Sequence, residues 1–486
     1  MGFPSFDLGL TTGGAAPTLR PRQWQSRLIQ LLRARLLNPE PGGHDVLIHA
    51  GPGAGKTLGA LLSFQAMQRE GRIGHFVVFC HRSSIARQWL AAAARLNLQL
   101  VEWDPEQGLA ALHPSRGWDG LLLSYQSAGR HRRPLSAALG AGSLGTWLAI
   151  ADEVHHLGLD PDEPEAAAWG FAFGQLTSGA RLRLGLTGTP FRADNLAFCA
   201  ARRVRVREGE EEIERIVPDL SIAPRQLILA GDVRPLEFRF QDGWVDHGRP
   251  QASAPTETSP LSGEGRESWR ARNLRRAIRL GDSSCIALRL LLNARKRLEL
   301  VRTSHPEAGG LVIARDIAHA RRITGLLEEQ GDRVHLVHSQ DPAAATRLAG
   351  FQAGEADWLV SIDMCAEGFD APRLRVVAYL TTVVTRSRFV QAITRAVRID
   401  GGRSSLEAIP RDPSYVFAPA DPLLIRYARS WSISEPYLIR PRLATPGSVN
   451  AGGNGSQQPL ETVGERIGQV IQLGGPELPD FLGQRA

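Results

Sequence analysis

The chain has 486 residues but only 4 cysteines, only two lysines and no long apolar run. The cysteines lie far apart without a Cys-x-x-Cys pair, which argues against a disulfide framework, a zinc ribbon and an iron–sulfur ligand set. No apolar stretch approaches the roughly 18 residues of a membrane span, and no basic-then-apolar signal peptide opens the chain. We therefore expect a multidomain cytoplasmic protein without a membrane partner.

Positive charge is carried almost entirely by arginine. All but two of the 57 basic residues are arginine, and against 50 acidic residues they leave a net charge of +7. Spread over this length, the excess favours a polyanionic partner only weakly. A GC-rich coding bias would also produce such a composition. Because lysine is so rare in this chain, the presence of Lys56 and Lys296 calls for a chemical reason.

Short apolar strands alternate with helical periodicity in two separate parts of the chain. This alternation predicts βαβ units and parallel sheets, and hence two α/β domains. A helix is expected over Trp24–Leu37, where apolar residues recur at helical spacing. The expected strands are Val46–His49, Phe76–Cys80, Leu121–Ser124, Trp147–Ala151, Leu182–Leu186, Leu311–Ala314, Val334–His338, Trp358–Ile362 and Val376–Leu380.

Composition divides the chain into five parts. Two stretches rich in Gly, Ser and Pro have almost no apolar periodicity and are typical of a linker and a flexible tail. Apolar residues from Leu460 to Ile471 could line a short helix in the tail, although two glycines weaken that pattern. We expect a flexible N-terminus (1–18), a first domain (19–241), a flexible linker (242–267), a second domain (268–444) and the tail (445–486).

The turn after the first strand reads Ala50-Gly-Pro-Gly-Ala-Gly-Lys56-Thr57 and matches a phosphate-binding loop except for its first residue. Glycines let successive N–H groups face a phosphate at the positive end of the following helix. Lys56 would reach the β- and γ-phosphates, and the Thr57 hydroxyl would bind Mg²⁺. The alternative is a glycine-rich helix start that binds nothing. The predicted nucleotide-binding residues of this loop are Gly51, Gly53, Ala54, Gly55, Lys56 and Thr57.

An acidic pair, Asp152 and Glu153, ends the predicted strand Trp147–Ala151 and is followed by Val-His-His. A carboxylate at this place opposite a phosphate-binding loop can hold Mg²⁺, and its neighbour can orient and deprotonate the attacking water. The alternative is an acidic helix start that complements the helix dipole. The loop upstream makes the catalytic interpretation the more specific of the two.

The second domain carries two arginines, Arg395 and Arg398, three residues apart. On one helix, both could point across a domain interface at the γ-phosphate of a bound nucleotide. Arginine suits this task because its planar fork stays charged and can bind two oxygens at once. The alternative is a solvated basic helix face.

Together these motifs resemble those of superfamily 2 helicases and translocases of the DExH type. The resemblance spans roughly residues 19–437 and is strongest to type III restriction translocases and XPB-type repair helicases. The segments that carry it are Leu19-Arg-Pro-Arg-Gln23, Asp152-Glu-Val-His155, Leu186-Thr-Gly-Thr-Pro190, Glu367-Gly-Phe-Asp-Ala-Pro372 and Gln391-Ala-Ile-Thr-Arg-Ala-Val-Arg398. Thr394 stands where this family usually has glycine.

The resemblance implies two tandem RecA-like α/β domains with ATP and Mg²⁺ in the cleft between them. Lys56, Asp152, Glu153, Arg395 and Arg398 would be catalytic, and Thr57 and Asp152 would hold the metal. Further implied roles are adenine recognition by Gln23, nucleotide contact by Gly368 and Asp370, coupling through Thr187, Thr189 and Gln391, and nucleic-acid contact by Arg82, Ser124, Tyr125 and Gln126.

The expected function is that of an ATP-dependent DNA helicase or translocase. Two alternatives stay open. One is an RNA helicase with the same ATP-hydrolysing domains. The other is a nucleotide-switched nucleic-acid-binding subunit of a repair or defence complex, without unwinding activity. Lys296 is the only lysine outside the phosphate-binding loop, and the residues around it match none of the nuclease motifs that require a lysine. We therefore expect no nuclease activity of those kinds. Sequence specificity would then come from loops or from a protein partner.

Overall fold

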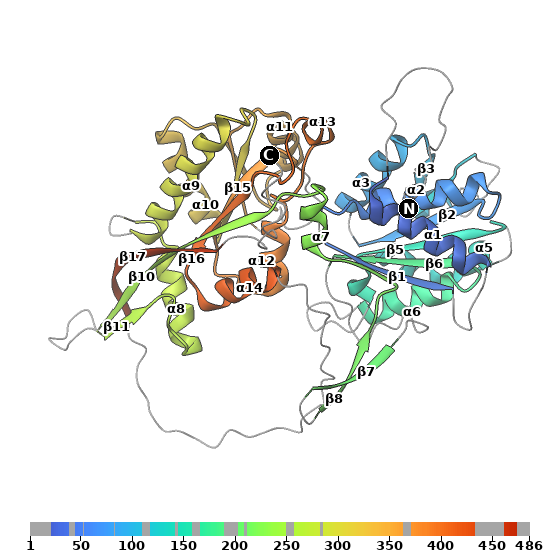
Figure 1. Cartoon of the computed structure of the whole chain (residues 1–486), viewed down its shortest axis with the longest axis horizontal. Coiled ribbons are helices and arrows are strands. Elements are labelled where there is room, and N and C mark those ends of the chain that lie inside the picture. The colour runs from blue at the N-terminus through green and yellow to red at the C-terminus, as the bar shows by residue number, and fades with distance from the viewer. Residues whose placement is uncertain are drawn as a thin grey trace, which may run out of the picture.

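The computed structural model consists of two bodies, each built around one sheet of mainly parallel strands (Figure 1). The amino-terminal half forms the first body and the carboxyl-terminal half the second. The structure describes residues 21–37, 44–51, 53–81, 83–108, 117–140, 144–157, 166–188, 203–208, 211–248, 257–281, 285–362, 371–432 and 461–473. None of the helices within these ranges is long and apolar enough to cross a membrane. The expected fold class, two tandem RecA-like α/β domains, is confirmed.

The first sheet has seven strands, all parallel, in the order β3-β4-β2-β5-β6-β1-β9. Every residue of β1 and β5 is buried, because helices cover both faces of the sheet. This explains why the sequence shows continuous apolar runs here instead of alternation. The strands are β1 (Asp45–Ala50), β2 (His75–Cys80), β3 (Leu100–Glu102), β4 (Gly120–Ser124), β5 (Trp147–Asp152), β6 (Leu182–Thr187) and β9 (Leu220–Ile222).

Two core clusters lie on the two faces of this sheet. One includes Phe64 and Trp89 from the helices α2 and α3, and the other includes Leu135 and Phe173 from α5 and α6. The helices are α1 (Gln23–Leu37), α2 (Lys56–Arg69), α3 (Ser83–Ala94), α4 (Tyr125–Arg130), α5 (Arg132–Gly140), α6 (Ala166–Leu176) and α7 (Pro224–Leu229). Short 3-10 turns occupy Pro105–Gln107 and Val154–Leu157. An antiparallel hairpin, β7 (Arg203–Glu208) and β8 (Glu211–Ile216), projects from this body (Figure 1).

The second sheet has eight strands, and only β11 and β17 run antiparallel to their neighbour β10. One edge of β10 pairs first with β16 and then with β11, while β17 pairs along its other edge. The strands are β10 (Leu236–Gly248), β11 (Glu257–Pro260), β12 (Gly309–Ala314), β13 (Val334–Val337), β14 (Trp358–Ser361), β15 (Leu374–Leu380), β16 (Ser414–Pro419) and β17 (Glu461–Leu473). The helices are α8 (Glu267–Ala277), α9 (Ile286–Arg302), α10 (Ile317–Glu329), α11 (Ala344–Ala353), α12 (Arg386–Ile393), α13 (Gly401–Ser404) and α14 (Pro422–Ser432).

The boundary between the two bodies differs from the predicted one. Strand β10 belongs to the second sheet, so the second body begins at Leu236, inside the predicted first domain. The same strand continues to Gly248, which contradicts a flexible linker over its first residues. The prediction failed because the second half of β10 is rich in polar residues and glycine, and main-chain pairing with the distant strands β11 and β17 holds it in the sheet.

The predicted helix in the tail is wrong, because residues 461–473 form β17. Gly468 opposes the bulge in β10, where an added Cβ would lie 3.0 Å from the carbonyl carbon of Asp242 and the amide nitrogen of Gly243. Glycine is the residue that permits such a close backbone approach. Ile471 and Leu473 pack against the core, so tertiary contacts stabilise the strand.

Candidate nucleotide site

The parallel arrangement of β1, β6 and β5 brings three predicted motifs to one edge of the first sheet. Strand β6 lies between the other two, pairing with β1 on one side and β5 on the other. Because the carboxyl ends of parallel strands share an edge, the phosphate-binding loop, Thr187 and the Asp152–Glu153 pair meet there. Thr187 is fully buried at the end of β6.

The loop between β1 and α2 has the backbone of an anion-binding turn. Gly53 and Gly55 adopt positive φ angles of 78° and 80°, which other residues rarely take. Ala54 between them is fully buried, and α2 begins directly afterwards at Lys56. Thr57 is half-buried in the first turn of that helix. The loop therefore leads directly into the start of a 14-residue helix, the strand–loop–helix arrangement that anion-binding loops use.

Glu153 lies at the centre of the described contacts. Its carboxylate is 3.4 Å from the Lys56 ammonium and accepts a hydrogen bond from the Gly188 amide at 3.3 Å. The Lys56 ammonium also donates to the carbonyl of Ala50 at 3.4 Å. Glu153 has a φ of 49°, and a non-glycine residue with such an angle is typical of a functional site. Loop lysine, acidic pair and β6 end thus form one connected group.

Asp152 is held in place by two aromatic residues, Trp89, which sequence reasoning missed, and Tyr125, for which it predicted a different role. The Trp89 indole donates to its carboxylate at 2.7 Å, and the Tyr125 hydroxyl donates to its backbone carbonyl at 2.8 Å. Burial and the neighbouring charge of Glu153 raise the pKa of Asp152 to about 6, against the lowering effects of Lys56 and of the Trp89 hydrogen bond. No sequence signal pointed to Trp89, because a tryptophan on an amphipathic helix is typical of a core residue.

Helix α1 and Arg22, the residue before it, hold the phosphate-binding loop through contacts that the sequence did not reveal. Arg22, Trp24 and Gln25 donate hydrogen bonds to the carbonyls of Gly53, Ala54 and Gly55, at 2.7, 3.0 and 3.0 Å. Each of these side chains therefore binds one carbonyl of the loop and holds the loop in position. Gln23, the predicted adenine-reading residue, is exposed at the start of α1.

The segment that connects the two bodies lies between the loop and the second body. Arg22 forms an ion pair with Asp232 at 3.2 Å, and the Arg234 amide donates to the carbonyl of Val397 at 2.8 Å. A Cβ added to Gly53 would lie 3.2 Å from the Val397 side chain and 3.6 Å from Cγ of Arg398. The predicted arginine segment therefore reaches the phosphate-binding loop.

The local structure around the two arginines differs from the prediction. Helix α12 ends at Ile393, so Arg395 lies in the turn that follows the helix, Arg398 lies directly after that turn, and the two are not on one helix. Thr394 ends the helix, and the hydrogen bond from Arg234 to Val397 then ties the following turn to the connecting segment. Arg395 is 9% exposed, whereas Arg398 is half-buried.

The remaining predicted residues have different outcomes. Ser124 accepts a hydrogen bond from the Ser127 amide and so caps α4, and Gln126 is half-buried in that helix. Tyr125 is 1% exposed, so its side chain is not available to nucleic acid and instead supports Asp152. Gln391 is half-buried on α12. The predicted residues Arg82, Thr189, Gly368 and Asp370 lie outside the described part of the chain.

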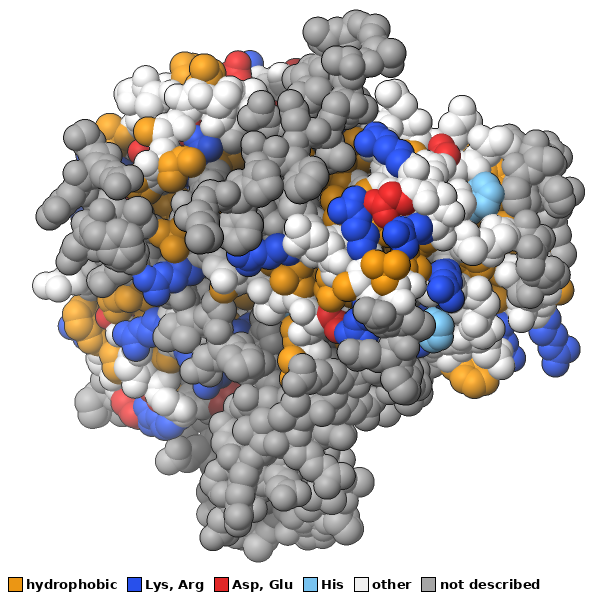
Figure 2. All heavy atoms as spheres, turned by 45° about the vertical axis from the view of Figure 1, so that its right-hand side comes forward, with side chains coloured by type: hydrophobic (Ala, Val, Ile, Leu, Met, Phe, Trp, Pro, Cys, Tyr) orange, Lys and Arg blue, Asp and Glu red, His pale blue; other side chains and the backbone are white. Residues whose placement is uncertain are grey.

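Surface charge by itself does not mark a path for nucleic acid. Figure 2 shows the face on which the first body comes forward, and the Lys and Arg side chains on it form several separate groups. No continuous basic stripe crosses the described part of this face. Candidate contacts with a polyanion therefore have to come from particular side chains and their partners.

Two family descriptions match the chain, one for each body. Residues 18–192 match "Type III restriction enzyme, res subunit", and residues 294–400 match "Helicase conserved C-terminal domain". The chain belongs to helicase superfamily 2. The first match covers the phosphate-binding loop, the acidic pair and β6 of this helicase, and the second includes the segment with Arg395 and Arg398.

Relatives of this superfamily 2 helicase occur in mycobacteria. It is 29% identical over 489 residues to an uncharacterized protein of Mycobacterium tuberculosis, a match that covers 95% of this chain and 75% of the relative. A second uncharacterized protein, from Mycobacterium leprae, is 30% identical over 412 residues, which cover 84% of this chain and 63% of the relative.

Two solved structures share the fold of this helicase. One is a fragment described as the HsdR subunit of a type I restriction enzyme from Vibrio vulnificus, with a TM-score of 0.50, 16% identity, and 84% of this chain and 65% of that chain covered. The other is the ATP-dependent Type ISP restriction-modification enzyme LlaBIII bound to DNA, with a TM-score of 0.51, 14% identity, and 82% and 28% covered. At these identities the likeness concerns the fold alone.

Proposed function

We propose that the protein is an ATP-dependent DNA helicase or translocase of the DExH type. The observation that carries the proposal is the meeting of Arg398 with Gly53, which brings a cationic segment of the second body to the phosphate-binding loop of the first. A nucleotide held by the loop would lie within reach of groups from both bodies, so its hydrolysis can change how the bodies sit on a strand. The DNA-bound LlaBIII structure and the type III restriction family favour DNA over RNA.

The roles proposed for the site residues follow from their contacts. The loop N–H groups and Lys56 bind the phosphates, and Glu153 orients and deprotonates the attacking water. In the present structure Glu153 is paired with Lys56, so nucleotide binding would draw Lys56 to the phosphates and release the carboxylate for the water. Arg395 and Arg398 stabilise the charge that develops on the γ-phosphate. Thr187, Thr189 and Gln391 would relay this change to the nucleic-acid grip.

The donor set fits a magnesium ion that is shared with the nucleotide. Magnesium bound with a nucleotide needs only one or two carboxylates, because phosphates and waters complete its octahedron. Thr57 and Asp152 supply a hydroxyl and a carboxylate at the start of α2 and the end of β5. Within the described residues no group of three or more His, Cys, Asp or Glu side chains forms a stand-alone metal site. The bound ion would neutralise phosphate charge.

Replacing Trp89 by Phe should weaken this proposed magnesium site. The indole hydrogen bond lowers the pKa of Asp152, so its loss raises that pKa above about 6 and leaves the carboxyl protonated at a higher pH. We expect the Mg²⁺ concentration for half-maximal ATP hydrolysis to rise about 10-fold, and more as the pH falls toward 6. Trp103→Phe, which removes the indole bond to Gly108 in the same domain, is the matched control. Equal Mg²⁺ curves for both variants would contradict the role of Trp89.

The proposed function is tested by ATP hydrolysis with single-stranded DNA, duplex DNA or RNA, in the wild type and in Lys56→Ala. DNA should stimulate hydrolysis, the variant should lose the stimulated rate, and salt should weaken stimulation steeply. Stimulation by RNA alone would identify the RNA helicase instead. Stimulation without strand displacement or translocation would favour the nucleotide-switched subunit. No stimulation by any of the three would contradict a motor that works without a protein partner.

A further inference from the structure

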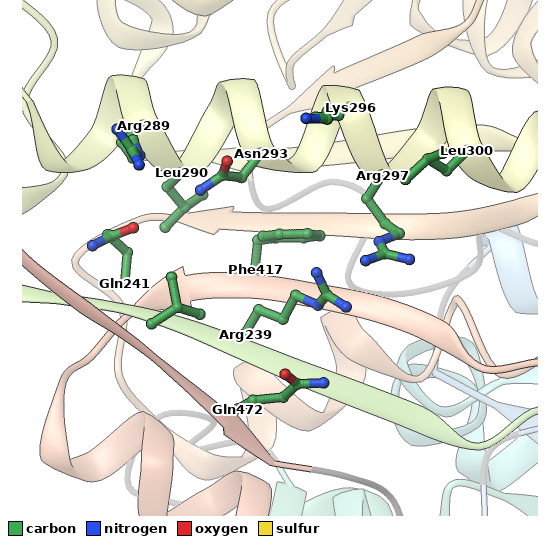
Figure 3. Close-up of a pocket in the computed structure, with 11 residues that line it drawn as sticks. Arg239, Gln241, Arg289, Leu290, Asn293, Lys296, Arg297, Leu300, Phe417 and Gln472 are labelled. Atoms are coloured by element: carbon green, nitrogen blue, oxygen red, sulfur yellow. The ribbon is translucent and has the colours of Figure 1, made fainter.

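A groove lies on the second body, on the face of its sheet that α9 covers (Figure 3). Helix α9 packs its apolar side, including Leu290 and Leu298, on the inner strands. Strands β10 and β17 extend the sheet past this helix, so its flank and their exposed faces enclose a cavity of about 470 Å³. This volume lies in the range of small-ligand sites, about 300–1,000 Å³.

Four cationic side chains line the groove. Arg289, Lys296 and Arg297 come from α9, and Arg239 comes from β10 (Figure 3). Lys296 is one of only two lysines in the chain, and the other is at the phosphate-binding loop. The proposed function gives Lys296 no task, so its place in this cavity is a separate observation.

The positive charge of the groove is largely uncompensated. Arg239 pairs with Glu237 at 2.7 Å, but Arg289, Lys296 and Arg297 have no carboxylate within ion-pair distance among the described residues. The guanidinium carbons of Arg239 and Arg297 lie 5.4 and 4.6 Å from the centroid of the same Tyr415 ring. Two like charges held on one ring repel each other, and an anion between them would relieve this repulsion.

The shape of the groove favours a strand over a compact anion. The cations of α9 are spread along the helix, and Arg289 and Arg297 are about 12 Å apart along its axis at 1.5 Å per residue. The side chains of Asn293, Gln241 and Gln472 add polar groups between them, and Leu290 and Val470 add apolar surface. Separated phosphates with sugars and bases between them match this alternation of charge, amide and apolar contact.

We propose that the α9 groove, defined by Arg239, Arg289, Lys296 and Arg297, binds the backbone of a single nucleic-acid strand. Arg289, Lys296 and Arg297 contact its phosphates, and the apolar and amide groups contact its sugars and bases. The proposal rests on the proposed function, because it assigns a strand to a protein that acts on nucleic acid. It places this contact on α9, away from the nucleotide site at the edge of the first sheet.

The test is binding of a fluorescent single-stranded oligonucleotide to the full chain without nucleotide, measured by anisotropy over a salt series. The test variant is Arg289→Gln/Lys296→Gln, because both side chains are exposed and their loss leaves the core unchanged. Arg69→Gln/Arg321→Gln removes the same charge from exposed sites on α2 and α10 and is the matched control. The test variant should bind about 10-fold more weakly, with a salt slope smaller by about 1.4, and the control should bind like the wild type.

Several outcomes would overturn the proposal. One is equal affinity and salt slope in the test variant and the wild type. Another is a competition result with the Lys56→Ala protein. If ATP or inorganic phosphate displaces the strand at the same concentration of phosphate groups, the groove binds small phosphates and not a strand. A third is a wild type that binds no strand, which would also remove the proposed function. Groove-dependent binding without stimulated ATP hydrolysis would instead support the groove and contradict only the motor.

Discussion

Replacing Glu153 by Gln should reduce nucleic-acid-stimulated ATP hydrolysis by about 10²- to 10⁴-fold, the range that a positioned general base contributes. The amide cannot take a proton from water, but it can still accept the hydrogen bond that Gly188 donates at 3.3 Å. The fold and the loop should therefore survive. Nucleotide affinity should change little, because the paired Lys56 keeps its charge and remains free to bind phosphate.

The measurement is the steady-state turnover number with saturating ATP and DNA, together with equilibrium binding of a fluorescent ATP analogue. Glu102→Gln, which makes the same chemical change at an exposed position on β3, is the control and should keep full turnover. Thermal unfolding should give the same midpoint for both variants. A Glu153→Gln protein that retains more than a tenth of the wild-type rate would disprove the assignment of the base.

Replacing Arg398 by Ala should have an equal or larger effect, about 10³-fold or more on turnover, as expected for an arginine that stabilises phosphoryl transfer. Its side-chain stem lies against Gly53, so in the proposed function a small closure of the two bodies would bring the guanidinium to the γ-phosphate. Arg398→Lys should not restore the rate, because an ammonium cannot replace the planar fork. Nucleotide binding should weaken much less than turnover, since the loop holds the phosphates.

Arg388→Ala is the matched control, because this half-buried arginine on the adjoining helix α12 carries the same charge. Arg395 is 9% exposed, so its replacement could destabilise the second body, which makes Arg398 the cleaner test. Single-turnover hydrolysis would separate the chemical step from product release. Wild-type turnover in Arg398→Ala would contradict the proposed site between the two bodies.

Much of the fold could be predicted from the sequence because its signals are local. Each inner strand of the first sheet, such as β1 or β5, is a short apolar run buried on both faces. Such a run can be recognised in the sequence without knowing which strands lie beside it. The phosphate-binding loop needs glycine at the positive φ angles of Gly53 and Gly55. Its conformation is therefore also encoded by neighbouring residues in the sequence. Parallel topology then requires the ends of β1 and β5 to share an edge.

Other features could not be predicted because they depend on contacts between distant residues. Strand β17 has a helix-like apolar spacing, yet it pairs with β10, more than 200 positions earlier in the chain, and its Gly468 fits a bulge there. In the same way, Trp89 reaches Asp152 across 63 positions, with no motif to mark it. The helix expected to carry Arg395 ends at Ile393, and the Val397 carbonyl beyond it accepts a hydrogen bond from the distant Arg234 amide.

The sequence by itself thus determined the two-domain α/β architecture, the phosphate-binding loop and the acidic pair, because backbone conformation and strand burial are encoded locally. Only the tertiary structure decided what supports these groups: α1 behind the loop, Trp89 and Tyr125 around Asp152, and the second body against Gly53. It also decided that Lys296 lies in a cationic groove. Such contacts arise from the packing of whole elements, and no single segment of the chain contains them.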